Sequence, residues 1–213
     1  MSGNAEIILN DVLEAKRSEI APEKSPNEYF EIFTAEQAVK EFELSYEEIE
    51  NGIVDGEHDG GVDAIYTFMN GELVDEEISF QIPKKAPDVE LIIIQSKSAN
   101  GFSESALNNL ISASRHLLSL SEEYGNLPQY NSEVKAKADI FRKTYRRLAA
   151  KFPTLKIKYI YAAKRSTGDV HQNLRLKADE LKQVARSLFE EAVVEVLFWV
   201  TIHTPPFLPR MKR

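Results

Sequence analysis

The sequence predicts an α/β fold in which a mixed central β-sheet is flanked by helices. Helical patterns alternate along the chain with apolar runs of strand character at 62–69, 90–97, 155–163 and 193–200. Strands joined through helices generally run parallel, whereas Asn70-Gly71 is a strong signal for a tight antiparallel hairpin. A sheet that contains both kinds of pairing accommodates both observations.

The first sixty residues are predicted to be largely helical. Residues 6–20 form an amphipathic pattern, and Ser25 followed by Pro26 begins a second helix that continues to residue 44. Ser45 and Glu48 have the spacing of a capping box, which starts a short third helix. The glycine- and acid-rich segment 51–61 is typical of an irregular turn that leads into the first strand.

The remaining elements follow from the same patterns. The run 90–97 is β-branched and apolar without alternation, which indicates a strand buried on both faces. The other expected elements are a returning strand at 72–80, a polar connector at 81–88, helices at 103–125, 132–151 and 169–191, and strands at 155–163 and 193–200. We therefore expect one domain over 1–200, with 1–24 as an N-terminal helical extension and 201–213 as a tail.

Composition excludes several classes of protein. There are no cysteines, which excludes disulfides, thiolate zinc sites and cysteine nucleophiles and suits a reducing interior. The N-terminus lacks the basic start and apolar run of a secretion signal, and no apolar run approaches the roughly 20 residues that span a bilayer. We expect a cytoplasmic protein that does not enter a membrane.

Charge is distributed unevenly. The net charge of −8 argues against binding a polyanion, but 133–165 is rich in Lys and Arg and contains only two acids, Glu133 and Asp139. A solvated helix face is the ordinary interpretation of such a segment. The alternative is a surface that tracks nucleic-acid phosphates through Lys137, Arg142, Lys143, Arg146 and Arg147. Tyr130 and Tyr145 could then stack on bases, although core packing is the simpler role for Tyr145.

Three polar residues at strand ends suggest a catalytic site. Asp63 opens one predicted strand, while Gln95 and Lys97 are two apart in another and so share a face. If the strands pair, Asp63 and Gln95 offer oxygen ligands to Mg²⁺ or Mn²⁺. Lys97 would hold the attacking water or stabilise the charge that develops at phosphorus. The alternative without a catalytic role is that 59–63 is only a turn and that Lys97 is a solvated charge.

The Asp-x(n)-Gln-x-Lys arrangement, following a helix that bears glutamates, resembles the PD-(D/E)XK nuclease superfamily. More narrowly, residues 44–56 and 59–66 are similar to the start of AIPR-type abortive-infection phage-resistance proteins. The resemblance covers roughly 27–120 by motif and extends to about 200 by order of elements. It implies a restriction-endonuclease-like αβββαβ core and a metal-dependent endonuclease that acts on DNA in phage or foreign-DNA defence.

The resemblance also implies catalytic roles for Asp63, Gln95, Lys97 and a glutamate on the first core helix. For that glutamate Glu36 is preferred to Glu31, because its separation from Asp63 is closer to that in related nucleases. Two features depart from the family. Gln95 replaces the usual Glu, which removes a negative charge and disfavours a second metal, and the family's further C-terminal region has no counterpart here.

Three functions therefore remain open from the sequence. The first is a metal-dependent nuclease that acts on DNA, with RNA left open as an alternative substrate. The second is a catalytically inactive module of the same fold that binds nucleic acid or supports an assembly, and the third is an interaction scaffold with neither activity. A homodimer would suit double-strand cutting by a fold with one site.

Overall fold

The computed structural model describes residues 4–54, 56–75, 82–98, 101–121, 127, 129–164 and 170–200. The helices are α1 (Asn4–Ile20), α2 (Pro26–Ala38), α3 (Tyr46–Asn51), α4 (Glu104–Leu117), α5 (Ser132–Leu148) and α6 (Gln172–Leu188), with short 3-10 helices η1 (Lys40–Phe42) and η3 (Ala149–Lys151). The strands are β1 (Ala64–Met69), β2 (Glu72–Leu73), β3 (Asp88–Lys97), β4 (Thr154–Ala163) and β5 (Val193–Val200).

The strands form one mixed sheet in the order β2-β1-β3-β4-β5. β1 pairs antiparallel with both β2 and β3, whereas β3, β4 and β5 run parallel and are joined through helices. The prediction of an α/β protein with a mixed sheet between helices is confirmed. Asn70 and Gly71 turn the chain from β1 to β2 with positive φ angles of 52° and 85°, as a tight hairpin requires.

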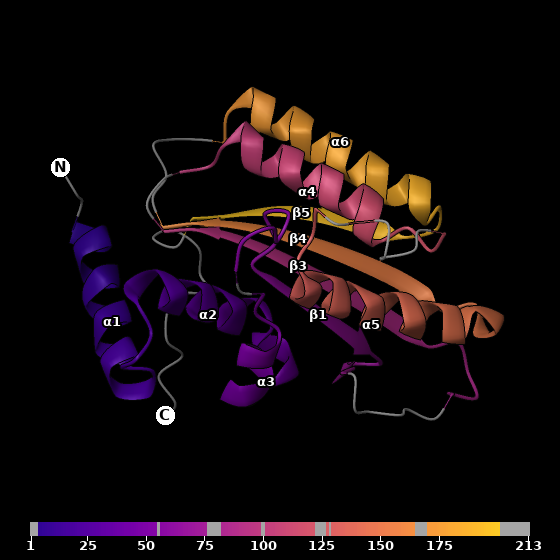
Figure 1. Cartoon of the computed structure of the whole chain (residues 1–213), viewed down its shortest axis with the longest axis horizontal. Coiled ribbons are helices and arrows are strands. Elements are labelled where there is room, and N and C mark those ends of the chain that lie inside the picture. The colour runs from indigo at the N-terminus through magenta and orange to yellow at the C-terminus, as the bar shows by residue number, and fades with distance from the viewer. Residues whose placement is uncertain are drawn as a thin grey trace.

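Helices cover the two faces of the sheet with separate apolar cores. α4 and α6 lie side by side over one face, and α5 packs on the same side beside β1 (Figure 1). Leu91 and Ile93 of β3 point into that core, whereas Ile92 and Ile94 point to the opposite face, where α2 packs. β3 is therefore buried on both faces, as its uninterrupted apolar run predicts.

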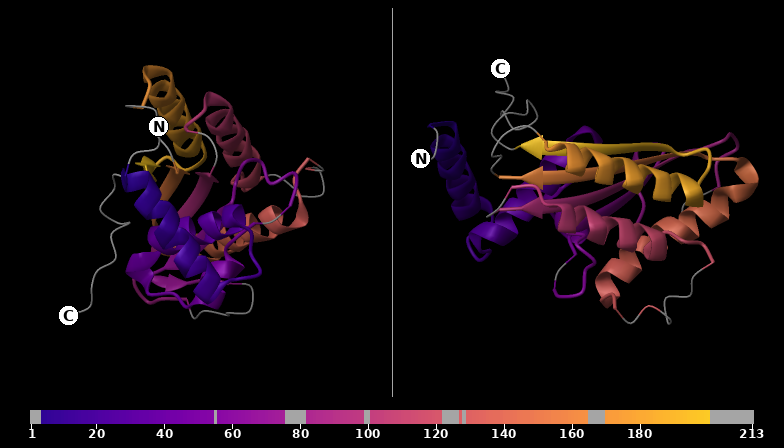
Figure 2. Two further views of the ribbon diagram at one scale, coloured as in Figure 1. Left: turned by 90° about the vertical axis from the view of Figure 1, so that its left-hand side faces the viewer. Right: turned by 90° about the horizontal axis from the view of Figure 1, so that it is seen from above.

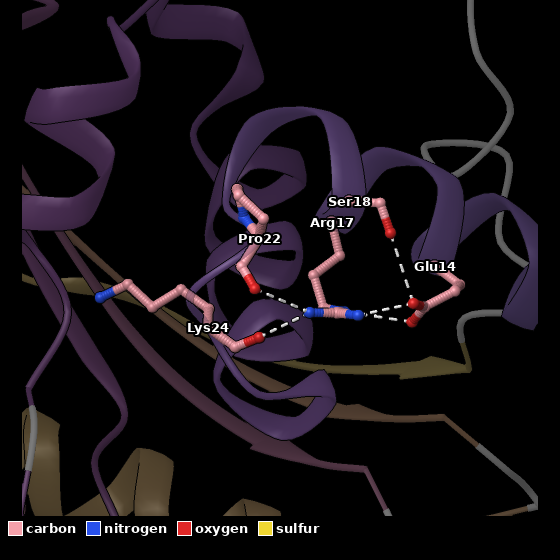
Figure 3. Close-up of polar contacts among 5 residues, drawn as sticks. All are labelled: Glu14, Arg17, Ser18, Pro22 and Lys24. Atoms are coloured by element: carbon pink, nitrogen blue, oxygen red, sulfur yellow. Dashed lines mark hydrogen bonds and ion pairs between the residues drawn. The ribbon is translucent and has the colours of Figure 1, made fainter.

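The N-terminal extension packs on α2 rather than on the sheet. Leu9 and Leu13 of α1 form a small core with Tyr29 and Phe33. Arg17 holds the turn between the helices, because its guanidinium donates to the carbonyl oxygens of Pro22 at 3.2 Å and Lys24 at 2.9 Å (Figure 3). The same guanidinium pairs with the carboxylate of Glu14 at 2.5 Å.

Helix ends match the predicted caps better than the predicted lengths. Both capping boxes form, Ser25 with Glu28 and Ser45 with Glu48. The second helix ends at Ala38 instead of residue 44, because the chain tightens into η1 and then turns. Two predicted segments, 76–80 of the returning strand and the tail 201–213, lie outside the described residues.

The two ends of the sheet have different surroundings. α1 and α2 lie near the carboxyl ends of β3, β4 and β5, while the C-terminal end of α5 lies at the opposite end of the sheet (Figures 1 and 2). Among the described residues, no helix has the length and apolar character needed to cross a membrane. The candidate site lies where β3 ends and β1 begins.

Gly52 allows the α3 turn to pack against β1, and its substitution tests this packing. A Cβ at Gly52 would lie 2.0 Å from Cε1 of Tyr66, a buried ring whose hydroxyl donates to the Ile49 carbonyl at 2.5 Å. We expect Gly52→Ala to lower the free energy of unfolding by about 3 kcal/mol in urea denaturation. Gly56→Ala meets no neighbouring atom and should cost only about 1 kcal/mol of backbone strain. Equal midpoints for the two variants would contradict the packing.

Candidate active site

Asp63 lies at the entrance to β1 and is held against the end of β3. The register pairs Ala64 with Ile94, and the Asp63 amide donates to the Ile94 carbonyl at 2.9 Å. Continuing the register by one residue places Asp63 opposite Gln95. Both residues then point to the face of the sheet that Ile65 and Ile93 share. The structure therefore brings together two strand ends that are about thirty residues apart in the sequence.

The carboxylate of Asp63 closes the β1–β3 ladder. Its Oδ2 accepts hydrogen bonds from the Ser96 amide at 2.5 Å and from the Ser96 hydroxyl at 3.0 Å. Loss of hydration raises the pKa of Asp63 to about 6, although the bonds from Ser96 and the charge of Lys97 act in the opposite direction. Asp59 contributes to the rise in the pKa of Asp63 through its own charge. The site therefore holds a carboxylate whose ionised form is poorly compensated by the protein.

Gln95 presents a carbonyl oxygen without a hydrogen bond. Its side chain is 1% exposed, and Oε1 has no hydrogen-bond partner among the described residues. Gly61 lies directly beside this amide, since a Cβ there would be 3.4 Å from Oε1 and 3.0 Å from Cβ of Asn109. With a φ of 76°, Gly61 combines a left-handed backbone with close approach, and both favour glycine. A buried acceptor of this kind is costly unless something outside the protein satisfies it.

Lys97 is the last residue of β3 and lies on the same face as Gln95. Its charge lowers the pKa of Asp63, which places the ammonium within electrostatic range of the carboxylate. The backbone carbonyl of Lys97 accepts from the Lys164 amide at 3.0 Å, so β4 fixes the end of the strand. Carboxylate, amide and ammonium thus gather at one end of the sheet.

Asp63 and Gln95 fit a hard divalent cation as a minimal pair of oxygen donors. Mg²⁺ commonly keeps several waters and binds through one or two carboxylates, so the pair is a sufficient protein contribution. Over the described residues, no group of three or more His, Asp and Glu side chains converges as a metal site. The donor set therefore suits one cation rather than two.

The structure does not bring Glu36 to this site. Glu36 lies on α2, is 41% exposed and faces Lys16 of α1 at 3.9 Å. α2 packs against the opposite face of the sheet through Ile32 and Ala35, and the Glu36 carboxylate pairs with Lys16 rather than with a residue of the candidate site, so its catalytic role stays a prediction. Glu31, the alternative, lines a separate hollow of about 420 Å³ between α2, α3 and α5. That hollow does not include the residues of the candidate site.

Contacts from α4 and α5 hold the loop that leads to Asp63. Asn131 caps α5 and also binds this loop, through its amide to the His58 carbonyl at 2.9 Å and through Nδ2 to the Glu57 carbonyl at 3.1 Å. Tyr130 packs beside Gly60 and bonds with Nδ1 of His116 at 2.9 Å. Sequence reasoning missed these positioning residues, because they are distant in the chain and belong to no recognisable motif.

Only part of the predicted basic surface is available for phosphates. Arg142 is 7% exposed, so its expected role as a phosphate contact is wrong. Lys143 pairs with Asp139 at 2.5 Å, and Lys137 lines the hollow beside Glu31 and Glu133. Arg146 and Arg147 are exposed in the last turn of α5. The usable positive charge therefore lies at the far end of that helix.

The two tyrosines considered for base stacking belong to the core. Tyr130 is 6% exposed and bonded to His116, and Tyr145 packs against Phe141 and Phe189. The simpler role expected for Tyr145 is confirmed. Tyr130 is therefore covered, and Tyr145 is only partly exposed.

Comparisons with known proteins leave the family open. No protein-family model matches the chain, and no match was found among curated proteins or solved structures. The likeness to PD-(D/E)XK nucleases therefore depends on the motif residues and their placement.

The raised pKa of Asp63 predicts a pH-dependent stability difference. A carboxyl with a folded pKa near 6 favours folding when protonated, below its ordinary pKa of about 4, and this contribution is lost as pH rises through 6. Asp63→Asn keeps an acceptor for Ser96 without the charge. We expect the variant to gain about 1–2 kcal/mol of unfolding free energy over wild type at pH 7–8, and none near pH 4, in urea denaturation. A difference independent of pH would contradict the shift.

Proposed function

We propose that this protein is a metal-dependent phosphodiesterase of the PD-(D/E)XK type that cleaves DNA. The convergence of Asp63, Gln95 and Lys97 where β1 meets β3 carries the proposal. Their residue types, their shared face and their order along antiparallel strands are those that the resemblance implies. A role in phage or foreign-DNA defence is part of the proposal and derives from that resemblance alone.

Each of the three residues has a distinct task in this proposal. Asp63 and Gln95 hold Mg²⁺ or Mn²⁺, which when bound supplies a Lewis acid for the phosphate and lowers the pKa of a water. Lys97 orients the attacking water and stabilises negative charge on the phosphoryl oxygens. Ser96 keeps the Asp63 carboxylate in place through two hydrogen bonds, and Gly61 leaves room beside the Gln95 amide.

The state of Asp63 and Gln95 supports a bound cation. Burial of the Asp63 carboxylate, whose pKa is raised, lowers the stability of the folded protein, and so does burial of the unpartnered oxygen of Gln95. A divalent cation between them would relieve both penalties at once. This is a reason, independent of the motif, to expect a cation here rather than a turn with a solvated lysine.

A catalytically inactive nucleic-acid-binding module is the second candidate. The observation that favours it is the single carboxylate among the proposed ligands, since Gln95 carries no charge and Glu36 lies elsewhere. Such a module would bind nucleic acid with a strong salt dependence and would not turn over in Mg²⁺.

Cleavage assays separate these candidates. Wild-type protein should nick or cut supercoiled and linear DNA in Mg²⁺ or Mn²⁺, and EDTA should stop the reaction. Lys97→Ala should reduce the cleavage rate by roughly 10²–10³, because it removes charge stabilisation at the phosphate. Glu36→Ala is the matched control and should cut at the wild-type rate. Equal rates for wild type and Lys97→Ala would remove the assignment, and metal-independent binding without any cleavage would favour the inactive module.

The exposed arginines of α5 predict the salt dependence of binding. Replacing Arg146 and Arg147 together by Ala should weaken DNA binding at low salt and reduce the slope of log K against log salt by about 1 to 2, since each phosphate contact releases counterions. Fluorescence anisotropy over a salt series measures this slope. The control is the double variant Arg175→Ala and Arg186→Ala, which removes the same exposed charge from α6. An identical loss in both double variants would place the contacts elsewhere.

A further inference from the structure

Phe152 combines two unusual properties at the end of the sheet opposite the candidate site. The ring is 85% exposed, the highest value among the large apolar side chains that the structure describes as exposed. Its backbone adopts a left-handed conformation with φ at 53°, which ends η3. This conformation is unfavourable for a bulky L-residue and is normally occupied by glycine. Single exposed apolar residues are common, but a strained backbone that projects one into solvent is not.

Basic residues precede this ring in the sequence. Lys151 precedes it, and the exposed Arg146 and Arg147 lie one turn back on α5. Among the acids at this end of the sheet, Asp88 accepts a hydrogen bond from the Thr154 hydroxyl and Glu90 pairs with Lys158 at 2.6 Å. Two further exposed acids, Glu190 and Glu191, precede β5 at the same end. In a chain with a net charge of −8, the segment 142–151 that leads to Phe152 is a local exception, because it carries five basic residues and no acid.

We propose that Phe152 is a stacking platform for an unpaired base of single-stranded nucleic acid, whose phosphates contact Arg146, Arg147 and Lys151. Stacking needs a base with a free face, which duplex interiors do not offer, whereas every unpaired base presents one. The positive charges of Arg146, Arg147 and Lys151 favour a polyanion over an apolar peptide as the ligand of this surface. Base stacking is tolerant of sequence, so the surface binds single strands without a preferred sequence.

The surface lies apart from the strand-end site. Asn131 caps α5 and binds the loop before Asp63, and the seventeen residues of the helix separate it from η3 by about 25 Å. Binding at Phe152 requires neither metal nor cleavage, so failure of this inference and failure of the proposed nuclease activity are distinguishable.

Phe152→Gly separates folding from binding. Glycine adopts the left-handed conformation without strain, so the variant should unfold at the same or a higher temperature than wild type. Its affinity for a labelled oligothymidylate of about 20 nucleotides, measured by anisotropy in EDTA at low salt, should fall roughly 5- to 100-fold. Affinity for a duplex of equal length should not change, and Phe152→Trp should retain single-strand binding.

Two control variants match the separate properties of Phe152. Glu43→Gly relieves a similar left-handed backbone, with φ at 52°, and Leu176→Ala removes an apolar side chain that is 61% exposed on α6. Both should bind the single strand at least as well as wild type. The inference is overturned if wild type does not bind it, or if Phe152→Gly binds both oligonucleotides with wild-type affinity. It is equally overturned if that variant loses only self-association, which would assign the ring to a contact between copies of the chain.

Discussion

The antiparallel pairing of β1 with β3 is the constraint on which the candidate site depends. β3 is apolar on both faces, so alternation alone does not define its register. Hydrogen bonds at both ends of the β1–β3 ladder define this register. Asn70 and Asp88 exchange hydrogen bonds of 2.8 and 2.9 Å at one end, and Asp63 binds Ser96 at the other. A slip of one residue would turn Gln95 to the opposite face and separate it from Asp63.

The same carboxylate that closes this ladder is the proposed ligand for a cation. The two roles are compatible, because Oδ2 accepts from Ser96 while the raised pKa of Asp63 shows that its charge is incompletely compensated. The interpretation of 59–63 as a turn without a functional role holds for Asp59, because its Oδ1 accepts a hydrogen bond from the Gly61 amide at 2.6 Å, as a turn residue does. It does not account for the unpartnered oxygen of Gln95. Burial of a polar atom without a hydrogen-bond partner is an unfavourable local feature of the kind found at functional sites.

Charge is arranged along α5 in a way that the helix sequence does not disclose. The first turns lie beside the glutamates of the hollow, and the last turn carries exposed arginines toward Phe152. The packing of α5 decides this, because it buries Arg142 and turns Lys137 toward the acids while leaving the far end in solvent. The proposed binding surface is consequently shorter, and more distant from Asp63, than the run of basic residues indicates.

The sequence by itself determined the local features of this protein: the capping boxes at Ser25 and Ser45, the Asn70-Gly71 hairpin, and the order of strands and helices. These depend on residues close together in the chain, whose hydrogen bonds and periodicity are visible in the sequence. The tertiary structure decided where Glu36 and Glu31 lie, which basic residues are exposed, and what surrounds Gln95. Those outcomes depend on the packing of α2 and α5 against the sheet, which brings together elements that are distant in the sequence.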